Sequence, residues 1–327
     1  MRRLSGKQVR SVTRRVLQRL NPVYKQNFER SFLMKDIDSC LNSVELQGAV
    51  GSAATQQHLP DPLSLSRLST ACIGLLALSL HTKEEEQQLF RADWLSESKL
   101  PNPNHILQCM LTQLANFSLS ASVLLERGLD NPARALCRHT MELSQQILAL
   151  MYSRDDFRIY IGGHDEKSST HIWNALFAKG KLNRRLSEIE ERLGFDAEMV
   201  DHMRAHRSSN YAFYSQAVHH SYIATTVGSY SPRFDGSWHS LGVFGGENAA
   251  VETTFRSLNF TLWYFLLVFF AILDKHHRIR PRNAKELFWL EAFMLHFCVK
   301  EGYLLLYTGT DNPIESSATH TSGAPAN

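Results

Sequence analysis

The chain has 327 residues, of which 43% are hydrophobic and 20% are charged, and its formal net charge is +3. These values are ordinary for a soluble globular protein, and the length permits one large domain or two small ones. The five cysteines form no CxxC pair, which argues against a disulfide framework or a zinc ribbon and fits a reducing, cytoplasmic location. They are Cys40, Cys72, Cys109, Cys137 and Cys298.

Residues 1–28 carry eight Lys or Arg residues and no acid. As a helix, this segment has an apolar stripe and a separate basic stripe, the latter made of Arg3, Lys7, Arg10 and Arg14. Three interpretations stay open: a docked terminal helix with a solvated basic face, a contact surface for nucleic acid or another anionic partner, and an organellar presequence. No secretory signal follows the basic start.

The rest of the chain shows helical periodicity throughout, which predicts an all-α protein built as a helical bundle. We expect a basic amphipathic arm over 1–30, an additional N-terminal helical region over 31–104, a bundle domain over 105–308 and a disordered tail over 309–327. Helices are predicted at 66–82, 105–128, 132–152, 168–179, 183–193, 197–220, 248–274 and 284–307. Segments 47–66 and 96–105 are typical of linkers, and the Gly- and Ser-rich segment 228–250 predicts a long ordered loop.

The best local signal is a helical hairpin around Gly128. This glycine is placed where a C-cap belongs, Asp130 or Asn131 can cap the next helix, and Pro132 suits the first helical turn. The run Phe260–Leu273 is the most apolar segment, but it is shorter than the ~20 residues that a bilayer requires. We therefore expect a buried core helix there and no membrane span.

The second arm of the hairpin carries Arg134, Arg138, Glu142 and Gln145 together, opposite its apolar arc. Helix geometry alone favours a solvated face with a weak ion pair between Arg138 and Glu142. If the face met another helix instead, its polar groups would require hydrogen-bond partners, as a structural network or as a site.

A resemblance adds to this. The segment LLERGLDNPARALCRHTMEL, followed by NYAFYSQAVHHSY, resembles a prokaryotic all-helical family of unknown function over about 105–275. That family carries a Gly-(Leu/Tyr)-x-x-x-Ala-x-x-Leu-x-Arg-x-x-x-Glu hairpin and a later Ser-x-x-Val-His segment. The resemblance implies that Arg138 and Glu142 meet Tyr214, Ser215 and His219 in a polar pocket.

Such a set could act as a metal-independent ribonuclease of the HEPN type, the helical nucleases of antiviral and toxin systems. In that chemistry an arginine stabilises the phosphate and a histidine transfers protons near neutral pH. The catalytic residues would be Arg138, Glu142, His219, Ser215 and Tyr214, with Arg134 and the basic arm contacting nucleic acid. Arg–His pairs at the family's spacing occur three times, which is about the number expected by chance.

We therefore predict a nucleic-acid-acting effector whose partner is RNA. The alternative is a non-catalytic binding module for a protein or small ligand, with Arg138, Glu142 and His219 as its polar anchor. A homodimer or a partner protein fits either prediction, and we expect no cofactor. A metal site at Glu198, His202 and His206 is less expected than a solvated helix face, because one His pair at this spacing is expected by chance.

Overall fold

The computed structural model describes residues 37–80, 103–163, 165–238, 245–278 and 287–308. The basic arm, with Arg3, Lys7, Arg10 and Arg14, lies outside the described residues, as do most of the predicted linker at 96–105 and the predicted tail. The described residues form α-helices and no strand, which confirms the predicted all-α bundle. The helices are α3 (Ile37–His58), α4 (Pro60–Ser79), α6 (Pro103–Glu126), α7 (Asp130–Tyr152), α8 (Arg154–Tyr160), α9 (Glu166–Leu176), α10 (Lys181–Arg192), α11 (Ala197–Val218), α12 (Tyr222–Ser229), α13 (Val251–Ala271), with a π-helical turn at Ile272–His276, and α14 (Leu287–Tyr307).

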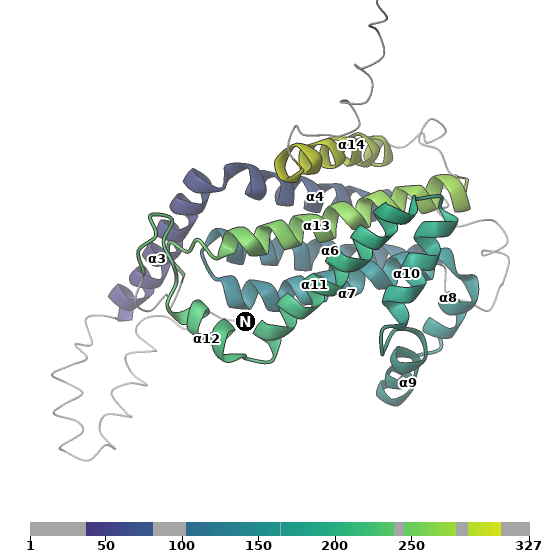
Figure 1. The fold of residues 1–327 in the computed structure, drawn as a ribbon, viewed down its shortest axis with the longest axis horizontal. Helices are drawn as coiled ribbons and strands as arrows, with labels where there is room; N and C mark the ends of the chain where they lie inside the picture. Colours follow the sequence, from purple (N-terminus) through teal and green to yellow (C-terminus); the bar gives the residue numbers. More distant parts are fainter. Residues whose placement is uncertain (1–36, 81–102, 164, 239–244, 279–286, 309–327) are drawn as a thin grey trace, which may run out of the picture.

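The long helices run side by side, with α13 at the centre (Figure 1). Helix α4 packs against α14, α6 and α13, whereas α7 packs against α6, α13 and α11. The short helices α8, α9 and α10 lie at one end of the bundle, and the longer α3 and the short α12 lie at the other (Figure 1). This arrangement leaves α7 between the bundle core and the shell that α10 and α11 form.

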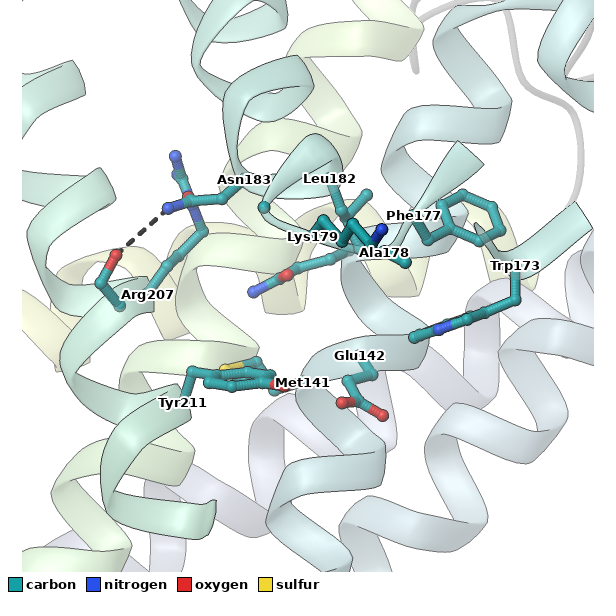
Figure 2. A pocket seen from close by; sticks show the side chains of 13 residues that line it. Met141, Glu142, Trp173, Phe177, Ala178, Lys179, Leu182, Asn183, Arg207 and Tyr211 are labelled. Carbon is teal, nitrogen blue, oxygen red and sulfur yellow. Dashed lines mark hydrogen bonds between the residues drawn. The ribbon is translucent and has the colours of Figure 1, made fainter. Parts of the chain in front are cut away.

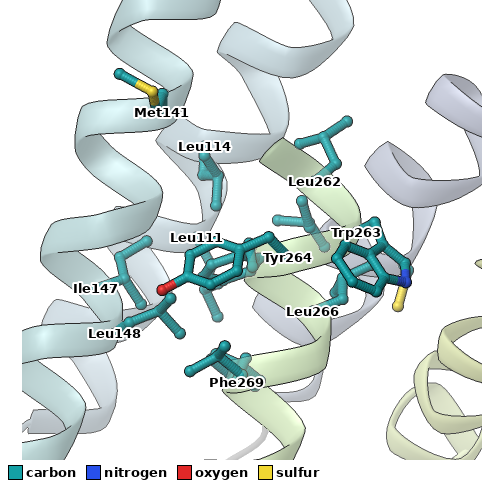
Figure 3. Close-up of a cluster of buried hydrophobic side chains, with 14 of the residues drawn as sticks. Leu111, Leu114, Met141, Ile147, Leu148, Leu262, Trp263, Tyr264, Leu266 and Phe269 are labelled. Atoms are coloured by element: carbon teal, nitrogen blue, oxygen red, sulfur yellow. The ribbon is translucent and has the colours of Figure 1, made fainter. Parts of the chain in front are cut away.

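Helix α13 is the buried core helix that the apolar run predicted. Its residues Tyr264, Leu266 and Phe269 meet Leu111 of α6 and Leu148 of α7 (Figure 3), and all five are at most 1% exposed. Two described helices, Pro60–Ser79 and Val251–His276, are long and apolar enough to cross a membrane. Since 56% and 78% of their apolar windows are buried inside the protein, this is weak evidence for a span.

The predicted linker at 47–66 is wrong, because α3 and α4 occupy it with a break only at Leu59. Pro60 and Pro62 fall in the first turn of α4, where a missing N–H costs nothing. Helix α4 precedes the predicted start of the bundle domain at 105, yet Ile73 and Leu76 are fully buried in the same core as α6 and α13.

The hairpin turn after α6 has a left-handed glycine, as predicted: Gly128 has φ +80°. A Cβ at this position would lie 1.9 Å from the carbonyl oxygen of Gly246, and one at Gly245 would lie 2.2 Å from the carbonyl oxygen of Arg127. Thus the Gly-rich segment before α13 allows two backbone segments to touch. The amide of Asn248 closes this contact by donating to the Gly128 carbonyl at 2.9 Å.

Candidate functional site

The charged row of α7 packs against other helices, with Arg134 and Gln145 buried and Arg138 and Glu142 partly exposed, so the fully solvated face favoured by helix geometry is wrong. Arg134 is 6% exposed and pairs with the buried Asp130 at 2.6 Å. Its guanidinium also lies 4.1 Å from the ring centre of Phe213. The prediction that Arg134 contacts nucleic acid is therefore wrong, because its charge is already neutralised inside the protein. Asp130, which was predicted as a cap, is the first residue of α7 and forms this ion pair. Burial raises the pKa of its carboxyl.

Arg138 joins α7 to α11. Its guanidinium donates to Glu142 at 2.8 Å, to the Ser215 hydroxyl at 2.5 Å and to the Tyr211 hydroxyl at 2.5 Å. The same group lies 3.8 Å from the centre of the Tyr211 ring. The Arg138 side chain is 14% exposed and that of Glu142 is 22% exposed, so the network is partly shielded from water. The resemblance correctly brought Arg138, Glu142 and Ser215 together, but it missed Tyr211.

The other two predicted residues lie elsewhere. Tyr214 points into the core, where it is fully buried, and burial raises the pKa of its hydroxyl well above the usual value. His219 is the exposed C-cap of α11, one turn after Ser215. Within the described part of the chain, no hydrogen bond or ion pair joins its ring to Arg138 or Glu142. The predicted catalytic set is thus divided between the network, the core and the surface.

A cavity of about 520 Å³ opens beside this network, between α7, the α9–α10 turn and α11. Figure 2 shows Trp173 and Tyr211 on opposite sides of it, with the carboxylate of Glu142 between them. The lining residues are Met141, Glu142, Gln145, Trp173, Phe177, Ala178, Lys179, Gly180, Leu182, Asn183, Arg207, Ser208 and Tyr211. The turn bends sharply because Lys179 and Gly180 both have left-handed backbones, with φ +56° and +75°. We refer to this cavity as the α7–α11 pocket.

A second buried network supports the far wall of the α7–α11 pocket. Arg207 is 3% exposed; it pairs with Glu190 and donates to Asn183 at 2.8 Å and to Ser187 at 3.1 Å. Tyr264 of α13 donates to the same Glu190 oxygen at 2.5 Å. Burial raises the pKa of Glu190, while Arg207 and Tyr264 oppose that rise. Arg207 therefore ties α10, α11 and α13 together, and its charge is balanced.

Other candidate sites have less support. A smaller cavity of about 350 Å³ lies between α6 and α7, and Glu142 lines both this cavity and the α7–α11 pocket. Cys137 is fully buried, and burial raises the pKa of its thiol, so it does not supply a thiolate. His206 stacks on Phe260 at 4.6 Å, and no group of three or more His, Cys, Asp or Glu among the described residues could hold a metal.

The fold and the site define an all-α bundle with a cavity beside two polar networks, of which the Arg207 network is buried and the Arg138 network is partly exposed. No protein-family model, curated protein or solved structure matches the chain.

Proposed function

We propose that this protein is a helical binding module for a small ligand, and that the ligand occupies the α7–α11 pocket. One observation carries the proposal: Arg138 fixes two groups that line the pocket, the Glu142 carboxylate and the Tyr211 ring, through direct hydrogen bonds. A concave site of this size with a few oriented polar groups is typical of small-molecule sites. Arg138 acts as a positioning residue, since it does not itself line the cavity.

The proposal also accounts for the charged row on α7. Arg134 serves the core, Arg138 orients the site, and Glu142 and Gln145 line the cavity. A helix face exposed to water would require no such partners, whereas a preorganised site requires rigid support behind its contact groups.

Its test is a binding experiment on the full chain. We would incubate the protein with the protein-free small-molecule extract of its expression host, remove unbound compounds and identify what the denatured protein releases by mass spectrometry. An Ala178→Trp variant fills the pocket, and Ala175→Trp, on an exposed position of the neighbouring helix, is its control. We expect a compound retained by the wild type and Ala175→Trp and lost from Ala178→Trp. Equal retention by all three would contradict the proposal.

A metal-independent ribonuclease is the second candidate, and the contact between Arg138 and Ser215 favours it because it joins the two segments of the resemblance. Purified protein would be incubated with mixed cellular RNA, with and without EDTA, beside a folded His219→Ala variant. Cleavage that survives EDTA and disappears in the variant supports the nuclease. Absence of cleavage in every sample leaves the binding module alone.

A further inference from the structure

Gln145 gives the first indication of the ligand's chemistry. It is 8% exposed, lines the α7–α11 pocket and has no hydrogen-bond partner within the described part of the chain. Neither of its amide atoms is among the fully buried polar atoms without a partner, so the amide is open to the cavity, where it offers two N–H donors and one carbonyl acceptor. The side chain can therefore hydrogen-bond a polar group of a ligand.

The walls indicate a flat ligand. Trp173 and Tyr211 are 38% and 47% exposed, and both side chains line the cavity. They lie on opposite sides of the cavity (Figure 2). Aromatic side chains of this kind bind planar heterocycles by stacking, at roughly 1–3 kcal/mol per ring.

The charged side chains around the pocket favour a ligand with an anionic group at one end. Glu142 is paired with Arg138, and Arg207 is paired with Glu190, so each of these charges is balanced. Lys179, on the exposed turn, has no carboxylate partner among the described residues. One positive charge at the rim is left for a phosphate.

Together these groups match the hydrogen-bonding edge of one nucleobase. The Gln145 amide can donate to a ring carbonyl. The two Glu142 oxygens can accept from two adjacent N–H groups, since Oε1 accepts only from Arg138 and Oε2 has no hydrogen bond within the described part of the chain. Guanine presents this pattern, a carbonyl beside two donors, whereas adenine presents an amino group beside a ring-nitrogen acceptor. We propose that the α7–α11 pocket binds a guanine base that carries a phosphate; this rests on the proposed function.

The test is calorimetric titration of the full chain with GMP, AMP, CMP, guanosine and inorganic phosphate. We expect GMP to bind at least tenfold more tightly than AMP or CMP. Glu142→Gln should abolish that preference, and Gln145→Leu should weaken GMP at least fivefold. Lys179→Ala should weaken GMP but leave guanosine unchanged, whereas Lys167→Ala, on the exposed surface of α9, should change neither. AMP or CMP binding as well as GMP would overturn the proposal.

Two sources can supply this chemistry: a free nucleotide and an unpaired guanine in RNA. A short single-stranded RNA with one guanine would be titrated beside GMP, and GMP would be added as a competitor. Either ligand, bound with sensitivity to Glu142→Gln, supports the inference. If neither binds but the wild type retains another compound that Ala178→Trp loses, the guanine inference fails and the proposed function stands. If no compound is retained either, both fail.

Discussion

Arg138 shows how much one side chain decides in this protein. Its three hydrogen bonds reach Glu142 on its own helix and Ser215 and Tyr211 on α11, and its planar guanidinium lies over the Tyr211 ring. Lysine cannot replace Arg138 here, because an ammonium group lacks the planar set of N–H donors that hydrogen-bonds several acceptors at once. Its loss would leave the Glu142 carboxylate half-shielded and without a counter-charge.

We expect Arg138→Met to lower the free energy of unfolding by about 2 kcal/mol, since hydrogen bonds to charged groups are lost in a partly buried setting. Chemical denaturation measures this directly. The control is Arg204→Met, which removes an exposed pair with Asp201 on α11 and should cost less than about 0.5 kcal/mol. Equal effects of the two substitutions would show that the Arg138 network adds nothing beyond a surface ion pair.

A histidine predicts a pH dependence. His296 is 8% exposed and stacks on Phe270 at 4.3 Å, and burial, with a smaller contribution from Lys300, lowers its pKa from 6.5 to about 4. Between these values the unfolded chain binds a proton that the folded protein does not. Stability therefore falls as pH falls from about 6.5 to 4, by about 3 kcal/mol at most.

The measurement is the free energy of unfolding against pH for the wild type and for His296→Leu. The variant should lose this slope, so the wild type should lose stability relative to the variant as the pH falls from about 6.5 to 4. Comparison is required because Asp130 and Glu190, whose pKa values are raised, act in the opposite direction. Parallel curves between pH 4 and 6.5 would mean that His296 does not titrate in this way.

At the level of secondary-structure elements, hydrophobic periodicity predicted where helices form better than it predicted what packs against them. The hairpin of α6 and α7 and the apolar helix α13 were predicted with bounds close to those observed. The pattern of α7 was also read correctly as a polar face and an apolar face, but periodicity cannot show what covers the polar face. Only the Arg–Glu and Ser–His resemblance indicated that α11 packs there, and it did not extend to Tyr211 or Gln145, which no motif marks.

Amino-acid composition led to the wrong prediction of a linker at 47–66, where α3 and α4 lie. Segment 47–66 has glycines and prolines that are typical of linkers, but Gly51 lies within α3 and the prolines lie in the first turn of α4. A Cβ at Gly51 would lie 2.4 Å from the carbonyl oxygen of Arg127. This glycine is therefore needed for close packing against the hairpin turn, a tertiary reason that local sequence does not contain.

The hairpin turn supplies the test at this scale. Gly128→Ala places a methyl group against the Gly246 carbonyl at a positive φ, whereas Gly236→Ala has a positive φ and open space around it. We expect both to destabilise, because both backbones are left-handed, and Gly128→Ala to cost at least about 1 kcal/mol more. Thermal and chemical denaturation of the two variants measure the difference. Equal losses would mean that the backbone segments separate easily.

Across the whole molecule, the apolar core is continuous from α4 through α6 and α13 to α10. Two buried ion pairs lie at its edge toward α11: Arg134 with Asp130, and Arg207 with Glu190. Neither arginine stood out as a core residue in the sequence, because charged side chains are rarely buried without a partner and the partners of Arg207 lie on other helices. Apart from the helical segment at 47–66, sequence reasoning lacked the long-range partners of these side chains more than it lacked the helices.

The Arg207 network predicts how the shell and the core unfold. Arg207→Met should cost about 3–5 kcal/mol, because it leaves the Glu190 carboxylate buried without its counter-charge. Adding Glu190→Gln removes that charge and keeps an oxygen that can accept from Tyr264, so the double variant should recover at least about 1 kcal/mol. Urea denaturation followed by circular dichroism and by tryptophan fluorescence measures both. Coincident transitions in the wild type would show that α10 and α11 unfold with the core. If the double variant were less stable than Arg207→Met, the ion pair would not be what couples the two layers.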